Sequence, residues 1–72
     1  MDDFNLKILD LEYAVKNYKK ELRRVKTTVN KLEKLGLSIP SELLFKKEDL
    51  EIILKERKQE LKLQKKIVEL IK

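Results

Sequence analysis

Apolar residues in the first half of the chain recur at alternating intervals of four and three. The series comprises Phe4, Ile8, Leu11, Val15, Tyr18, Leu22, Val25, Val29 and Leu32. This heptad spacing places one apolar stripe along a single face of a helix, as in coiled coils. A half-buried strand would instead alternate apolar and polar residues with a period of two. The spacing therefore predicts a long helix over about residues 3–35.

The only glycine and the only proline of the chain, Gly36 and Pro40, follow this stripe. Gly36 falls on the next stripe position and can adopt the left-handed conformation with which many helices end. Pro40 has no backbone N–H to continue that helix, and it biases Ile39 away from helical angles. We expect a turn over about residues 36–45, with Ser41 as a cap, and a second helix over about residues 46–71.

A second stripe with the same spacing follows the turn, and two of its members are polar. It comprises Leu50, Leu54, Arg57, Leu61, Gln64, Val68 and Ile71. Two helices of similar length joined by a short connection pack antiparallel, so that each stripe covers the other. The chain is thus predicted to be one all-α domain, residues 1–72, folded as an antiparallel coiled-coil helical hairpin.

The two stripes also suggest a register. In the antiparallel match that we expect, the residue numbers of opposing stripe residues add up to 82 or 83. Arg57 then lies opposite Val25 and forms a weak point of the apolar seam. Gln64 lies opposite Tyr18, whose hydroxyl is expected to hydrogen-bond to the amide and fix the register, as buried polar residues do in coiled coils.

Opposite charges gather at both ends of such a hairpin. One end holds Asp2, Asp3, Asp10 and Glu12 beside Lys62, Lys65, Lys66 and Lys72, and the other holds Lys26, Lys31 and Lys34 beside Glu48, Asp49 and Glu51. Each cluster also complements the dipole of its own helix. Single surface pairs contribute only a few tenths of a kcal/mol, about the cost of ordering them. We therefore expect these charges to select the antiparallel orientation rather than to supply stability.

The hairpin has more apolar residues than one seam needs. In the expected register residues 1–9 project past the second helix, which itself carries a second apolar stripe. The surplus residues are Phe4, Leu6, Ile8, Leu9, Leu63, Ile67 and Leu70. A chain of 72 residues seldom buries a sufficient core without a disulfide, a metal or a partner chain. We expect these residues to form a self-association surface, with a homodimer that makes a four-helix bundle as the favoured assembly.

Composition excludes most catalytic chemistry. The chain has no cysteine, no histidine and one glycine, so it contains no disulfide, no ordinary zinc site and no glycine-rich phosphate loop. Ser38 and Ser41 flank Pro40 and are expected to be turn residues rather than nucleophiles. The expected function is a non-enzymatic helical module that self-associates and binds a protein partner, with no cofactor and no metal.

A basic run in the first helix supports an alternative function. Six cationic residues share the face turned away from the seam: Lys16, Lys20, Arg23, Arg24, Lys31 and Lys34. Such a row, in a chain with a formal charge of +5, is able to follow nucleic-acid phosphates. Coiled coils also place lysines on their outer faces for solvation alone. The alternative is therefore a small basic nucleic-acid-binding protein that uses the outer face of the first helix.

Apolar runs in this chain are short. The longest contain three residues, whereas a membrane-spanning helix needs about 20. The N-terminal residues also lack the basic-then-apolar order of a signal peptide. We therefore expect an intracellular chain, located in the cytoplasm.

Overall fold

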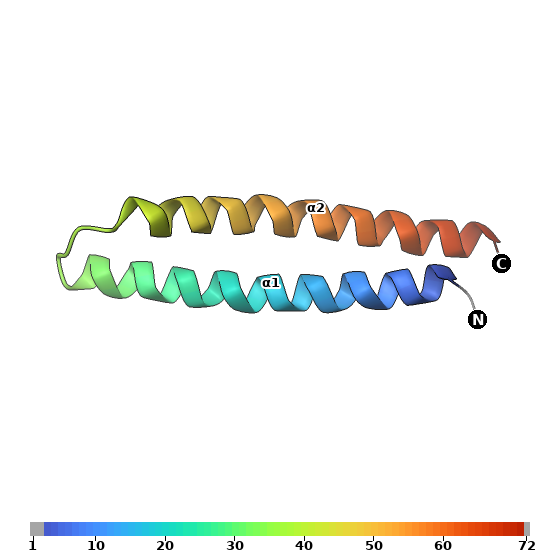
Figure 1. Cartoon of the computed structure of the whole chain (residues 1–72), viewed down its shortest axis with the longest axis horizontal. Coiled ribbons are helices and arrows are strands. Elements are labelled where there is room, and N and C mark those ends of the chain that lie inside the picture. The colour runs from blue at the N-terminus through green and yellow to red at the C-terminus, as the bar shows by residue number, and fades with distance from the viewer. Residues whose placement is uncertain (1–2, 72) are drawn as a thin grey trace.

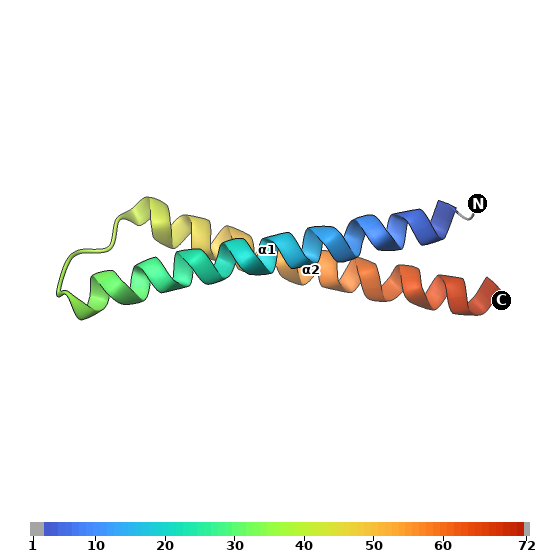
Figure 2. The same ribbon diagram turned by 90° about the horizontal axis from the view of Figure 1, so that it is seen from below.

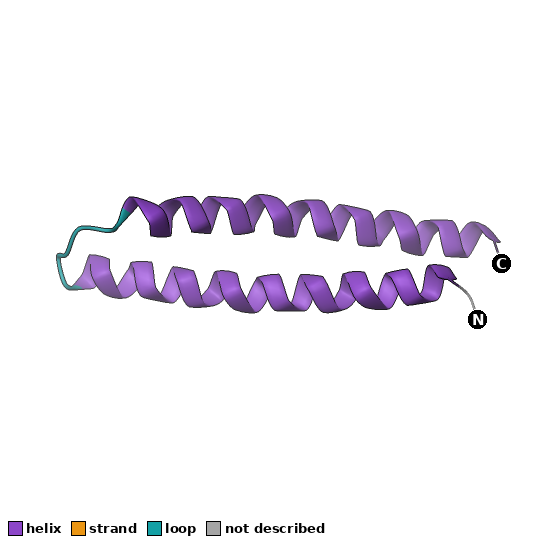
Figure 3. Cartoon of the chain, viewed as in Figure 1, coloured by secondary structure: helices purple, strands orange, loops and turns teal. Residues whose placement is uncertain are grey.

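The structure is a computed structural model that describes residues 3–71, apart from the side chain of Phe4. It consists of α1 (Asp3–Lys34) and α2 (Ser41–Ile71), which run antiparallel side by side (Figure 1). Colouring by secondary structure shows the same two helices and one connection, without a strand among the described residues (Figure 3). The all-α helical hairpin that the sequence predicts is confirmed.

The hairpin is a rod of 55 × 16 × 15 Å. In a view turned by 90°, α1 crosses in front of α2 near the middle of the rod (Figure 2). Such slow winding keeps two heptad stripes in contact along their whole length. Neither α1 nor α2 contains a segment apolar and long enough to cross a membrane.

The end of α1 is a Schellman turn built on Gly36. Its backbone has a φ of 71°, in the left-handed region that glycine adopts without strain. The N–H of Gly36 donates to the carbonyl of Glu33 at 3.0 Å, and the N–H of Leu37 donates to the carbonyl of Leu32 at 3.0 Å. These two bonds satisfy carbonyl groups that the helix end would otherwise leave without partners. The predicted helix end at Gly36 is confirmed.

The second helix starts at Ser41, earlier than the expected start near residue 46. The carbonyl of Pro40 accepts bonds from the N–H groups of Leu43 at 3.0 Å and Leu44 at 3.4 Å, so the helix forms directly after the proline. Proline suits this position, because its φ is already helical and its missing N–H has no role there. Ser41 is consequently the first helical residue and not a cap, and the connection is shorter than expected.

Stripe residues from both helices form the core. The buried members that pack together are Val15, Leu22, Val25, Val29, Leu50 and Leu54. Tyr18, Ile39, Leu43 and Leu61 are partly buried and pack against them. The buried apolar side chains remain 4–8% exposed, and none of the described side chains is fully enclosed. The predicted seam is therefore confirmed, but two helices leave it open along both flanks.

Two ion pairs between the helices define their register. Lys46 Nζ lies 3.4 Å from Glu21 Oε1, and Lys65 Nζ lies 3.5 Å from Glu12 Oε1. The residue numbers of these pairs add up to 67 and 77, values centred on 72 rather than on 82 or 83. In the expected register Lys46 would be level with residues 36–37, about 22 Å along the axis from Glu21. The expected register is therefore wrong by about three helical turns.

A single register accounts for both ion pairs, with the numbers of stripe residues at one level adding up to 72. It pairs Ile8 with Gln64, Leu11 with Leu61, Val15 with Arg57, Tyr18 with Leu54, Leu22 with Leu50, Val25 with Lys47 and Val29 with Leu43. Each ion-paired residue directly neighbours a stripe residue in the chain, which is where coiled coils place charges that link helices. The contact faces are those expected from the sequence, but their levels differ.

This register changes the neighbours of both polar stripe residues. Arg57 is level with Val15 instead of Val25. Gln64 is buried, and its Oε1 accepts no hydrogen bond from the described part of the chain. Tyr18 lies at another level, so the expected hydrogen bond between Tyr18 and Gln64 is wrong.

The expected overhang of residues 1–9 is also wrong over the part that the structure describes. Residues 3–9 lie beside the last turns of α2, and both described chain ends lie at the same end of the rod (Figure 1). Ile8 is half-buried, because it is a seam residue level with Gln64. Residues 1 and 2 lie outside the described part of the chain.

Candidate functional site

The two ion pairs mark the two flanks of the seam. Residues seven positions apart on a coiled-coil helix share a flank. On the side of the pair between Glu21 and Lys46 we define the apolar flank, which contains Lys7, Ala14, Thr28, Ile53, Glu60 and Ile67, together with Leu63 and Leu70, which lie three residues after Glu60 and Ile67 on the adjacent row of α2. On the side of the pair between Glu12 and Lys65 we define the charged flank, which contains Lys19, Lys26, Glu33, Leu44, Glu51 and Lys58. Most apolar side chains of the first flank belong to α2, whereas the second flank is lined mainly by Lys and Glu.

On the apolar flank the apolar side chains are only partly covered. Ala14, Ile53 and Ile67 are half-buried, whereas Leu63 and Leu70 are exposed. All but Ala14 belong to α2, and three of these gather near the end of the rod that holds both described chain ends. This arrangement offers a stripe of branched side chains to another helical surface.

The apolar flank also carries one ion pair within α2. Arg57 is level with the seam, and its Nη1 donates to Glu60 Oε2 at 2.9 Å. The side chains of Arg57 and Glu60 are 44% and 36% exposed, so the guanidinium leaves the seam toward the flank. The acidic partner of Arg57 therefore belongs to the same helix.

The structure divides the residues expected to self-associate. Leu63, Ile67 and Leu70 lie together on the apolar flank, whereas Ile8 lies in the seam of the hairpin. Leu6 and Leu9 are exposed on α1 but occupy heptad positions that face away from the seam and from this flank. The side chain of Phe4 lies outside the described part of the structure. Ile53, further along the same stripe of α2, also lies on this flank. Ala14 joins the flank and was missed, although it lies seven residues before Glu21.

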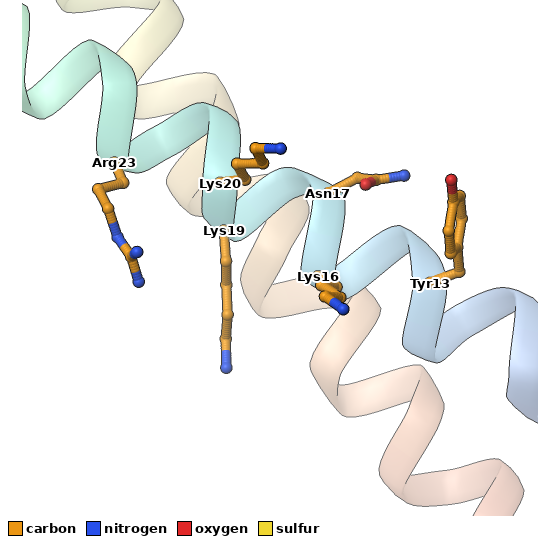
Figure 4. A pocket seen from close by; sticks show the side chains of 6 residues that line it. All are labelled: Tyr13, Lys16, Asn17, Lys19, Lys20 and Arg23. Carbon is orange, nitrogen blue, oxygen red and sulfur yellow. The ribbon is translucent and has the colours of Figure 1, made fainter.

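The basic residues expected on the outer face of α1 are all exposed. Lys16, Lys20 and Arg23 lie together around a shallow depression of about 560 Å³, with three residues that were not among the six expected contacts: Tyr13, Asn17 and Lys19 (Figure 4). Arg24, Lys31 and Lys34 do not line it. Lys19 was missed because its heptad position lies beside the seam, yet its side chain extends outward with that of Arg23 (Figure 4).

Catalytic geometry is not a feature of either surface. Within residues 3–71, no three acidic side chains lie close enough together to hold a metal ion, and the sequence has no histidine or cysteine. The serines near Pro40 have neither a histidine nor a cysteine as a neighbour, since the chain contains none. The two surfaces offer contacts and charge, which are the chemistry of binding.

Comparison with known proteins adds no further assignment. No family model matches the chain, and no curated protein and no solved structure matches it. The described fold defines the class, an antiparallel two-helix coiled-coil hairpin.

Proposed function

We propose that the chain is a non-enzymatic assembly module that pairs with a second copy of itself through the apolar flank, giving a four-helix bundle. The observation that carries this proposal is the uncovered stripe on α2, where Leu63 and Leu70 are exposed beside the half-buried Ile53 and Ile67. The opposite flank is lined mainly by Lys and Glu, so only one side of the rod suits apolar contact.

The exposed area of the chain supports a second copy as the occupant. The hairpin exposes 6100 Å², whereas a compact monomer of 8.6 kDa is expected to expose about 4,700 Å². The surplus of about 1,400 Å² exceeds the roughly 800 Å² per partner that a stable protein interface buries. If two hairpins paired along the apolar flank, each copy would lose solvent-exposed area of about this size. The same contact would cover the seam on that flank.

Symmetry favours a dimer over an open chain of copies. Two identical flanks that meet across a two-fold axis use the same surface on each copy, so the assembly closes. Each copy then buries Ile53, Leu63 and Ile67, while the Lys and Glu residues of the charged flank stay on the far side and the ion pairs of Glu21 with Lys46 and of Arg57 with Glu60 lie beside the interface. A different helical protein with a similar apolar stripe is an alternative occupant, which the experiment below separates from self-association.

Sedimentation equilibrium of the chain over a wide concentration range tests the proposal. We expect a dimer whose melting temperature rises with concentration, because association stabilises only the folded state. Ile67→Asp should shift the population to monomer and reduce helicity, since the monomer buries too little area to offset chain entropy. Ile52→Asp is the matched control, because Ile52 is exposed and lies away from the apolar flank.

Two results would contradict the proposal. A fully helical monomer at every concentration, with a constant melting temperature, would leave the flank for another protein. If Ile67→Asp and Ile52→Asp lowered the average molecular mass in sedimentation equally, the copies would associate through some other surface.

A further inference from the structure

Positive charge is concentrated in the middle of α1. Residues 13–32 contain seven Lys or Arg and one acidic residue, Glu21, so they carry a formal charge of +6, whereas the whole chain carries +5. Glu21 is moreover engaged by Lys46 of α2, which adds another cation beside it. Two further acidic residues flank this stretch: Glu12 is paired with Lys65, whereas Glu33 forms no ion pair with a described residue. Two of the three carboxylates in or beside the stretch are therefore turned toward lysines of α2.

The charge is also one-sided. The segment of α2 level with residues 13–32 spans residues 40–59, and its five acidic and five basic residues cancel. Lys16, Lys19, Lys20 and Arg23 lie on the outer side of α1 around the shallow depression (Figure 4). None of these four forms an ion pair with a described carboxylate. A one-sided row of unneutralised cations attracts polyanions.

An aromatic ring lies at one end of this row. Tyr13 is 69% exposed, and its ring stands on the same side of the helix as the ends of Asn17 and Lys20, whereas Lys19 and Arg23 extend to the other side (Figure 4). Such an exposed ring is accessible for stacking. Proteins that bind single strands combine cations that follow the phosphates with aromatic side chains that stack on bases. Asn17, between the ring and the lysines, adds a hydrogen-bonding amide.

We propose that this surface, formed by Tyr13, Lys16, Asn17, Lys19, Lys20 and Arg23, binds single-stranded nucleic acid. The cations contact successive phosphates, and Tyr13 stacks on one base. A membrane surface fits less well, because helices that bind lipid insert apolar side chains next to their cations. Here the apolar side chains of residues 14–23 belong to the seam or lie beside it, and the exposed Leu6 and Leu9 share the outer face of α1 but lie seven residues before Tyr13 and Lys16, outside the cationic row. The proposal goes beyond assembly, and the surface faces away from the apolar flank, so a dimer would present it twice.

Fluorescence anisotropy with a labelled oligothymidine tests the proposal at about 50 and about 200 mM salt. We expect binding at low salt that weakens at least about ten-fold at the higher concentration, because phosphate contacts release counterions. Lys16, Lys19, Lys20 and Arg23 all changed to Gln should weaken binding about 100-fold and lower the salt slope by about 3. Tyr13→Ala should weaken single-strand binding about ten-fold.

A charge-matched control separates a site from net charge. Changing Lys34 of α1 and Lys55, Lys62 and Lys66 of α2 to Gln removes the same number of charges from exposed positions outside the surface. We expect this variant to lose much less affinity than the variant changed at Lys16, Lys19, Lys20 and Arg23. Both variants should keep the helicity and solution mass of the parent chain, which distinguishes a failure of this proposal from a failure of assembly.

Four outcomes would overturn the proposal. No binding at low salt removes the site. Equal losses in the two charge variants mean attraction by net charge alone. Tighter binding to a duplex of the same length, with no effect of Tyr13→Ala, contradicts recognition of a single strand. Binding to vesicles of anionic phospholipid without binding to the oligonucleotide would assign the surface to membranes.

Discussion

Glu21 of α1 and Lys46 of α2 form an ion pair at 3.4 Å although their positions differ greatly in distance from the turn. Lys46 lies five residues into α2, whereas Glu21 lies thirteen residues before the end of α1. The pair is formed because α1 extends past the first residue of α2 at the turn, as Figure 1 shows. The connection after Gly36 therefore runs back along α1 before α2 begins.

This register predicts which cysteine pairs can be linked within one chain. Because the native chain has no cysteine, Glu21→Cys combined with Lys46→Cys gives a unique pair of thiols. We expect a short thiol-specific cross-linker to join them rapidly within a single chain, as seen by denaturing electrophoresis. Leu35→Cys with Lys46→Cys is the control that a register centred on 82 or 83 would favour, because Leu35 follows Glu21 by two heptads and shares its flank. Faster linkage of the control would contradict the register described above.

Arg57→Leu should raise the melting temperature. Arg57 occupies a stripe position level with Val15, and its ion pair with Glu60 is half exposed, so its loss costs at most about 1 kcal/mol. Burial of leucine at this position should contribute about 1–2 kcal/mol. We expect a net rise of several degrees, roughly 4–8 °C per kcal/mol, measured by circular dichroism. Glu60→Gln, which removes only the ion pair, is the control and should change little. A clear loss of stability in Arg57→Leu would reveal an acidic partner from another chain.

Gln64→Leu should also stabilise the hairpin. Gln64 is only 8% exposed, and an unpaired buried acceptor such as its Oε1 costs about 1–3 kcal/mol. We expect a gain of about 1 kcal/mol in the free energy of unfolding, measured by urea titration. Gln59→Leu is the matched control at an exposed position and should give no gain. If Gln64→Leu destabilised the chain, the amide would have to be hydrogen-bonded in solution.

Gly36→Ala should destabilise the turn. A Cβ at this position would meet no atom within 4 Å, so the cost comes only from the left-handed backbone with a φ of 71°. That conformation costs a residue with a Cβ about 1–2 kcal/mol. Gly36→Asn should cost less, because asparagine tolerates left-handed angles. Thermal unfolding of the two variants checks this order, and equal stability of Gly36→Ala and the parent would contradict the role of the glycine.

The helices and their contact faces could be predicted because heptad spacing and the two backbone breakers act locally. The register could not, because a heptad stripe matches an antiparallel copy of itself at several levels separated by whole helical turns. The register was not recognised because Lys47 interrupts the apolar pattern between Leu43 and Leu50. The stripe of the second helix therefore seemed to begin at Leu50, although it extends to Leu43. Lys47 is half-buried, as expected when its aliphatic stem packs and its ammonium reaches solvent.

The error in register also explains the error in the candidate surface. Residues 1–9 were expected to project past the second helix only because the expected register was wrong. Leu63 and Ile67 were recognised independently of the register, from their spacing on one helix. Exposure of the basic residues was predictable for the same reason. Tyr13 also faces outward by its heptad position, and it belongs to that surface because it lies three residues, about one helical turn, before Lys16.

The placement of both described chain ends at one end of the rod determines how the hairpin responds to force. Tension applied to residues 3 and 71 would act across the last layer of the seam and open the layers one after another, like a zipper. Tension applied between the Gly36 turn and one chain end would instead act along a single helix, where it stretches backbone hydrogen bonds and leaves the seam unloaded. The seam therefore opens under force only in the first direction, whatever the free energy of unfolding.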